Sequence, residues 1–103
     1  MRKIIAKEFT GNRAWAAMDI EEMECASLRL HWTDKPYIWH VNDGPEVFVV
    51  LDGEVDMHTR SEEGEETFHL KVGDIFHVQE GDEHMAHPRG AARILVVEKA
   101  GSI

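Results

Sequence analysis

The chain has 103 residues and a formal charge of −9, from 20 acidic and 11 basic side chains, and 43% of its residues are hydrophobic. This length suits a single domain, and the composition argues against a disordered chain and against a membrane protein. The acidic charge excludes an extended basic surface of the kind that binds nucleic acid or anionic lipid. We therefore expect one domain over residues 1–103 with neither of these partners.

The N-terminal half begins with two weak structural signals. Residues 3–6 are apolar enough to form a strand that pairs with a second subunit, whereas residues 15–24 are compatible with either a helix or a strand. No signal peptide is evident, and we expect a cytoplasmic protein. Cys25 is the only cysteine, so no disulfide can form within the chain, and we interpret it as an inert, half-buried thiol.

From Cys25 onward the hydrophobic pattern has a period of two, which is typical of strands. In residues 25–32 the apolar Leu30 and Trp32 alternate with Arg29 and His31, which predicts a half-buried strand. His31 then points outward or donates into a pocket, and the alternation favours the outward direction.

Residues 47–51 form a continuous apolar run, which predicts a strand buried on both faces. Further strands are expected at 55–60, 68–72, 75–78, 84–87 and 94–97. Turn signals separate these strands every 8–12 residues, a spacing that indicates an all-β sandwich or barrel.

Three polar residues stand where the pattern brings them toward one interior. His40 and Asn42 are two apart, so an extended strand points them the same way. Glu46 shares a face with Phe48, an apolar position where an unpaired charge is expensive. A metal ion or a hydrogen-bonding partner would offset this cost.

His84 follows a turn at Gly81 and can add an imidazole from a distant strand. Two neutral imidazoles and one carboxylate are suitable ligands for a divalent transition metal such as Fe, Mn, Ni, Zn or Co. We therefore take His40, Glu46 and His84 as candidate metal ligands, with an empty or purely hydrogen-bonded site as the alternative.

The spacing around the first of these residues resembles the first sequence motif of the cupin superfamily. That motif has the form HxH, three or four residues, Glu, six residues, Gly. Here His40-Val41-Asn42 is followed at this spacing by Glu46 and Gly53, and Asn42 stands where the motif has its second His.

The second cupin motif has the form G-x5-P-x-G-x2-H-x3-N, and this spacing is present as well. Gly73 leads to Gly81 and His84, with Gln79 in place of the Pro and Pro88 in place of the Asn. The resemblance covers about residues 36–98.

The resemblance implies a small single-domain cupin, an antiparallel β-barrel of jelly-roll topology with an internal site. It implies that His40, Glu46 and His84 bind one metal, at a site where Asn42 replaces the usual third His. Asn42 could bind the metal through its amide oxygen or hydrogen-bond a metal-bound water. Without it the set is two His and one carboxylate, as in many non-haem Fe(II) oxygenases.

Other conspicuous side chains have simpler interpretations. His58, His69, His77 and His87 are expected on the surface rather than in a second metal cluster. Trp32, Tyr37 and Trp39 could stack on a substrate, but we first interpret them as core or interface residues. Phe48 is expected to line the pocket, and His31 is the weaker candidate for its wall.

Two functions stay open. The first is a metalloenzyme acting on a small organic acid or sugar, of the oxygenase, isomerase or decarboxylase type that the resemblance implies. The second is a non-catalytic module that binds or senses a small molecule, with or without metal. In either case an open β-barrel has edges to cover, and we expect a homodimer.

Overall fold

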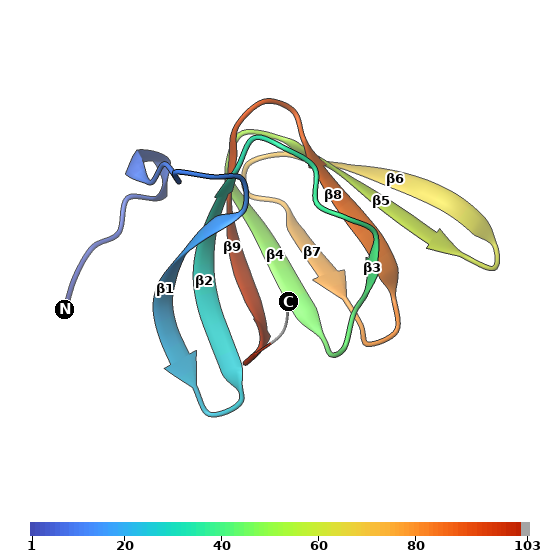
Figure 1. The fold of residues 1–103 in the computed structure, drawn as a ribbon, viewed down its shortest axis with the longest axis horizontal. Helices are drawn as coiled ribbons and strands as arrows, with labels where there is room; N and C mark the ends of the chain where they lie inside the picture. Colours follow the sequence, from blue (N-terminus) through green and yellow to red (C-terminus); the bar gives the residue numbers. More distant parts are fainter. Residues whose placement is uncertain (102–103) are drawn as a thin grey trace.

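The computed structural model describes residues 1–101, which form nine strands and one turn of 3-10 helix (Figure 1). The elements are η1 (Ala6–Glu8), β1 (Ala16–Met23), β2 (Ala26–Thr33), β3 (His40–Val41), β4 (Glu46–Asp52), β5 (Val55–Ser61), β6 (Gly64–Leu70), β7 (Ile75–Val78), β8 (Glu83–Pro88) and β9 (Ala92–Lys99). Within residues 1–101, no helix is long and apolar enough to cross a membrane.

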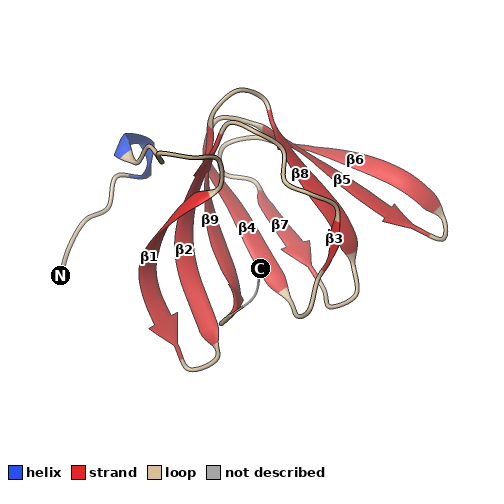
Figure 2. Ribbon diagram, in the orientation of Figure 1, coloured by secondary structure: helices blue, strands red, loops and turns tan. Residues whose placement is uncertain are grey.

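The strands form two antiparallel sheets that face each other (Figure 2). One sheet has the order β1-β2-β9-β4-β7 and the other the order β3-β8-β5-β6. The hairpin of β5 and β6 extends beyond the rest of the fold (Figure 1). This arrangement confirms the predicted all-β, jelly-roll fold.

The core lies between the sheets and is built by the alternation that the sequence displays. In β4, Glu46, Phe48 and Val50 are buried, while Val47 and Val49 are only partly buried. The apolar core cluster is Phe48, Val50, Val55, Met57, Leu70, Val78, Ala86, Ala92, Ile94 and Val96. The prediction that residues 47–51 are buried on both faces is therefore wrong, because only one face of β4 meets the opposite sheet.

The two N-terminal segments with weak signals have the following structure. Residues 3–6 pair with no strand within the described chain, and η1 begins at Ala6, so the pairing of this segment with a second subunit stays a prediction. The segment after η1 is held by Arg93, which donates hydrogen bonds to the Phe9 carbonyl at 2.8 Å and to Thr10 Oγ1 at 3.0 Å. Residues 16–23 are a strand rather than a helix, because β1 pairs with β2 from Ala16 to Met23, with a register shift between Asp19 and Glu21.

The face of strand β2 that points to the interior is the opposite of the expected one. Leu30 pairs with Leu95, which alternates with Ile94 and Val96 of the core cluster. Leu30 therefore points away from that core, although it is buried, and the Arg29 side of β2 faces inward. The polar residues of this strand are inside because they line a cavity.

Cys25 lies in the turn between β1 and β2 and is exposed. The prediction of a half-buried thiol is wrong, because the strand that was expected to include this residue begins at Ala26.

Candidate metal centre

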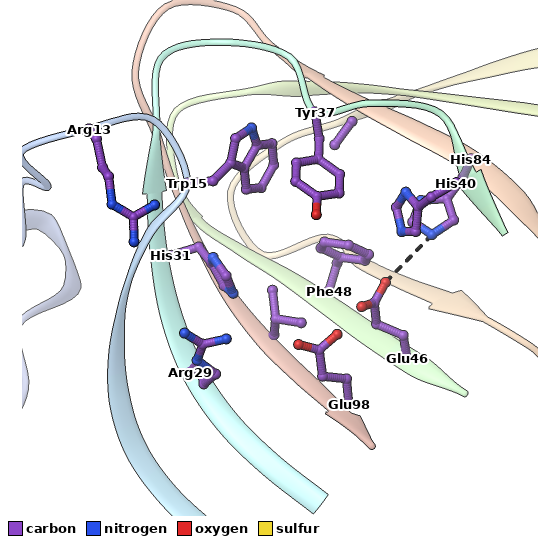
Figure 3. A pocket seen from close by; sticks show the side chains of 12 residues that line it. Arg13, Trp15, Arg29, His31, Tyr37, His40, Glu46, Phe48, His84 and Glu98 are labelled. Atoms are coloured by element: carbon purple, nitrogen blue, oxygen red, sulfur yellow. Dashed lines mark ion pairs between the residues drawn. The ribbon is translucent and has the colours of Figure 1, made fainter. Parts of the chain in front are cut away.

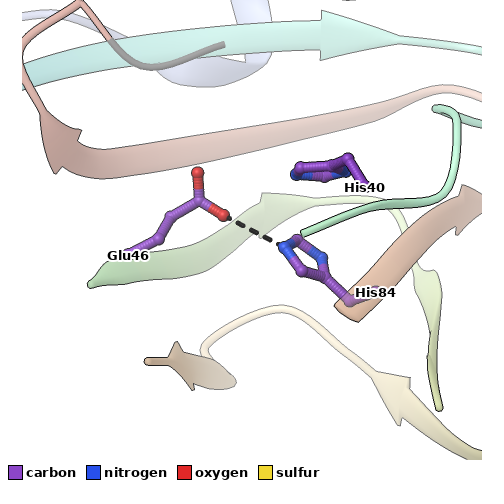
Figure 4. Close-up of side chains that lie close together, drawn as sticks. All are labelled: His40, Glu46 and His84. Carbon is purple, nitrogen blue, oxygen red and sulfur yellow. Dashed lines mark ion pairs between the residues drawn. The ribbon is translucent and has the colours of Figure 1, made fainter. Parts of the chain in front are cut away.

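Strand pairing brings the three candidate ligands together (Figure 4). His40 of β3 is directly opposite His84 of β8, and their ring centroids are 4.3 Å apart. Glu46 opens β4 on the facing sheet, with its side chain directed toward both imidazoles. One ligand atom from each residue lies within 4.8 Å of the others, and within residues 1–101 no other group of this kind occurs.

Glu46 is a buried carboxyl group without sufficient hydrogen-bonding partners. Its Oε1 has no hydrogen-bond partner and lies 3.6 Å from His84 Nε2. Burial is the main cause that raises the pKa of Glu46 to about 9, and both a hydrogen bond with Glu98 and the charge of Glu98 raise it further. A hydrogen bond with Asn42 acts in the opposite direction and lowers the pKa. In the metal-free protein Glu46 is therefore protonated at neutral pH.

His40 is oriented as a ligand by its own backbone. Its Nδ1–H donates to the Ile38 carbonyl at 3.1 Å, which leaves the lone pair of Nε2 available. Metal-binding histidines usually have their second nitrogen held by such an acceptor.

His84 is nearly completely buried and uncharged. Burial, followed by the electrostatic effect of the neighbouring His40, lowers its pKa to about 4, with a smaller opposing effect of Asp82. Its Nε2–H donates to Asn42 Oδ1 at 2.6 Å, and its Nδ1 has no partner. A neutral imidazole is the form that binds a metal.

Asn42 is buried with a fixed amide orientation. Its Nδ2 donates to the Gly44 carbonyl at 3.1 Å, so its oxygen faces His84. This position makes Asn42 a hydrogen-bond acceptor for His84, and a direct bond from Asn42 to a metal stays a prediction.

The three residues fit a divalent transition metal. Bond lengths of about 2.0–2.2 Å to imidazole and carboxylate require ligand atoms only a few ångströms apart, close to the spacing here. A cation would also give the unpartnered Glu46 Oε1 its missing interaction and would favour the ionised carboxylate.

The candidate centre forms one side of a cavity of about 300 Å³ (Figure 3). Phe48 and His31 both line this cavity, with Trp15 and Tyr37 between the sheets. The outward direction favoured for His31 is therefore wrong, because the Arg29 side of β2 faces the interior. Burial, followed by the charge of Arg29, lowers the pKa of His31.

The cavity also contains residues that the sequence analysis did not single out, above all Glu98 and Trp15. Glu98 is buried directly opposite Glu46 in the sheet. Its position was readable, because it continues the alternation of Ile94 and Val96 beyond the predicted strand. The position of Trp15 at the cavity depends on its left-handed backbone conformation, with φ of 60°, and no sequence pattern indicated this conformation.

The other histidines and aromatic residues lie elsewhere. His69, His77 and His87 are exposed, and the half-exposed His58 contacts Thr67 through Nδ1 at 3.0 Å. Of the aromatic residues, Tyr37 lines the cavity and Trp39 stacks on Arg60, whose guanidinium carbon is 4.1 Å from the ring centroid. Trp32 is half-buried and does not line the cavity.

Comparison with known proteins agrees with this fold. The sequence matches the family described as "Cupin domain" over residues 31–98, which is most of the chain. No curated protein matches the sequence.

Similar solved structures share the architecture at low sequence identity. A cupin-2 domain protein from Shewanella frigidimarina is 24% identical, with a TM-score of 0.76 over 86% of this chain and 84% of that chain. A cupin superfamily protein from Desulfitobacterium hafniense is 13% identical, with a TM-score of 0.77 over 92% and 86%. At these identities the likeness establishes the fold alone.

One similar structure is that of a named enzyme, the hydroxypropylphosphonic acid epoxidase from S. wedmorenis. It is 20% identical, with a TM-score of 0.63 over 72% of this chain and 43% of the longer enzyme.

Proposed function

The chain belongs to the cupin domain family, and we propose that it is a metalloenzyme acting on a small organic acid or sugar. In this proposal His40, Glu46 and His84 hold one divalent transition metal, of the set Fe, Mn, Ni, Zn and Co. The reaction is of the oxygenase, isomerase or decarboxylase type, and the substrate occupies the adjoining cavity.

The observation that carries this proposal is the Glu46 carboxyl group. It is 5% exposed, has one oxygen without a partner, and stands beside two imidazoles. Retaining an incompletely paired carboxyl group in a buried position costs stability, which supports a functional role for it.

The cavity supplies the other parts of an active site. A metal held here with open positions would polarise a bound oxygen atom or activate dioxygen. Phe48 lies against His84, at 5.8 Å between ring centroids, and restricts access from one side. His31 is placed to contact a substrate as a neutral imidazole. The epoxidase named above, which acts on an organic acid, supports an enzymatic role by analogy of fold.

One observation favours the alternative, a binding or sensing module without metal. The bond between His84 Nε2 and Asn42 Oδ1 gives the imidazole a partner without any ion. In this alternative the cavity binds a small molecule by hydrogen bonds alone.

Metal analysis of protein purified without an affinity tag or chelator tests the proposal. We expect close to one transition metal per chain in the wild type, and its loss in Glu46→Gln and His84→Ala. The exposed His77 provides a matched control, because His77→Ala should keep the metal. A folded wild type that takes up none of the five metals would contradict the metalloenzyme.

Oxygen uptake and product analysis with small acids and sugars then separate the enzyme from the binding module. Turnover that disappears in Glu46→Gln and persists in His77→Ala supports an enzyme. Ligand binding without turnover, unchanged in Glu46→Gln, supports the binding module.

We also propose that the protein is a homodimer. Val72, in the turn before the edge strand β7, and Ile75, its first residue, are 62% and 67% exposed, which suits an interface between subunits. Light scattering at micromolar concentration should give twice the chain mass, and Ile75→Lys should shift it toward the monomer. A monomeric wild type would contradict the proposal.

A further inference from the structure

The cavity has two chemically different ends. Figure 3 shows His40, His84 and Glu46 on one side and Arg13, His31 and Arg29 on the other. Between these ends stand aromatic rings, including Tyr37 and Phe48. A molecule that spans the cavity therefore meets the candidate metal centre at one end and guanidinium groups at the other.

Arg13 has no partner in the described part of the chain. Within residues 1–101, its guanidinium group makes neither a hydrogen bond nor an ion pair, although it lies at the wall of the cavity. Arg13 is exposed, and an arginine head that lines a cavity without an acceptor retains all its donors for a ligand.

Arg29 is only partly engaged. Its Nε donates to Asp19 Oδ1 at 2.9 Å, and Asp19 is 86% exposed, so solvent weakens this pair. The structure gives the terminal nitrogens of Arg29 no acceptor within residues 1–101, and Figure 3 shows them on the cavity side. Two guanidinium groups with free nitrogens on one side of a cavity are suited to bind a planar anionic group such as a carboxylate.

The wall beside this basic end is held by a strained backbone. Trp15 has φ of 60°, a left-handed conformation that is unfavourable for a bulky residue. This conformation places its ring 5.3 Å from Tyr37 and 6.0 Å from His31, between centroids, with both contacts edge-on. Strain of this kind is concentrated at ligand sites, and here it builds an aromatic wall two residues after Arg13.

We propose that Arg13 and Arg29 form a carboxylate-binding subsite, and that the substrate is a small organic acid rather than a sugar. Its carboxylate lies between the two arginines, its flat or apolar body lies against Trp15, Tyr37 and Phe48, and its opposite end faces His40, Glu46 and His84. The cavity volume of about 300 Å³ admits only a small molecule. The role of the opposite end rests on the proposed function, whereas binding of the carboxylate does not.

The test compares acids with their neutral amides on the full chain. Benzoate and benzamide, and pyruvate and pyruvamide, are titrated into ¹⁵N-labelled protein, and dissociation constants are taken from shifts of the backbone and indole resonances. We expect at least one acid to bind about tenfold or more tightly than its amide, because a charge-assisted pair is lost with the amide.

Substitutions of the arginines test which residues cause the preference for the acid over the amide. Arg13→Gln and Arg29→Gln should each weaken the acid about tenfold while leaving the amide nearly unchanged. Arg89→Gln is the matched control, since Arg89 is an exposed arginine paired with Asp56 and is not part of the cavity. Arg13→Gln removes no contact in the described chain, so loss of folding would not confuse the result.

The outcomes are separable from those of the metal test. If neither acid binds more tightly than its amide, or if Arg13→Gln and Arg29→Gln bind the acid as the wild type does, the subsite is refuted. If no metal binds but the acid still requires both arginines, the subsite stands and the metalloenzyme fails. If metal binds and acids show no preference, the metal centre stands and the organic acid fails.

Discussion

The buried carboxyl group of Glu46 makes the stability of the metal-free protein depend on pH in a direction that can be measured. Its pKa is about 9 in the folded chain, whereas in an unfolded chain it has the ordinary value of 4.5. Between these values the folded state holds one more proton than the unfolded state. The free energy of unfolding therefore falls as pH rises from 4.5 to 9.

His84 contributes the opposite slope at lower pH. The pKa of His84 is about 4 in the folded chain and 6.5 in the unfolded chain, so between these pH values the unfolded state binds the extra proton. Stability gained from His84 rises with pH up to 6.5 and is constant above it. Above pH 6.5, only Glu46 of these two residues changes the free energy of unfolding with pH. The effect of Glu46 is therefore best measured above pH 6.5.

The titration of one proton sets an upper limit on the change in the free energy of unfolding. A single proton changes the free energy of unfolding by at most about 1.4 kcal/mol per pH unit. From pH 6.5 to 9 the ceiling is about 3 kcal/mol. Glu46→Gln carries a permanently neutral side chain of the same shape, so its free energy of unfolding should not fall in this way. The gap between Glu46→Gln and the wild type should therefore widen by about 3 kcal/mol from pH 6.5 to 9.

Urea unfolding in the presence of a chelator, at half-unit steps from pH 6.5 to 9, measures this difference. The exposed Glu80 gives a matched control, because Glu80→Gln should follow the wild type at every pH. Other groups that titrate in this range are shared by all three proteins and cancel. Parallel curves for the wild type and Glu46→Gln would refute the assignment of a buried, protonated Glu46.

Three further predictions concern the site and its wall. Metal affinity, measured by competition with a chelator, should rise with pH between 6.5 and 9, since Glu46 must lose its proton to bind; a flat profile would contradict this. Glu98→Gln should strengthen metal binding at pH 7, because the hydrogen bond with Glu98 and the charge of Glu98 both raise the pKa of Glu46, whereas weaker binding would contradict this explanation. Trp15→Gly should be more stable to urea than Trp15→Ala by about 1 kcal/mol, because only glycine adopts φ of 60° without strain, and equal stability would argue against that backbone.

Much of the fold was predictable because its strands are short and their alternation is regular. That Glu46, Phe48 and Val50 share one face of β4 follows directly from a period of two, although the sequence predicted burial of both faces. The same rule placed His84 inside and His87, three residues later, outside. These predictions depend only on local pattern, and so they did not require knowledge of the other sheet.

The side of β2 that faces inward was not predictable in this way. Hydrophobicity favoured Leu30 as the interior residue, yet Arg29 and His31 face the cavity. Polar residues occupy this interior face because it lines a cavity rather than the apolar core, so an expectation based on hydrophobicity alone was wrong here. Arg13 and Trp15 were missed for another reason, since a left-handed turn and the opposite sheet, not their own neighbours, bring them to the site.

The substitution of Asn for His at position 42 has a consequence for how firmly a metal can be held. In the metal-free protein the single hydrogen of His84 is best placed on Nε2, where Asn42 Oδ1 accepts it. To bind a cation through Nε2, the imidazole must move this hydrogen to Nδ1, which is buried without an acceptor.

An unsatisfied buried donor costs about 1–3 kcal/mol, which is a factor of about 5 to 150 in affinity. His40 carries no such penalty, because its Nδ1–H is already bound to the Ile38 carbonyl. The two histidines are therefore unequal ligands, and His84 is the one that limits affinity. We expect this site to release its metal to chelators more readily than a centre with a third histidine, and Asn42→His to slow that release.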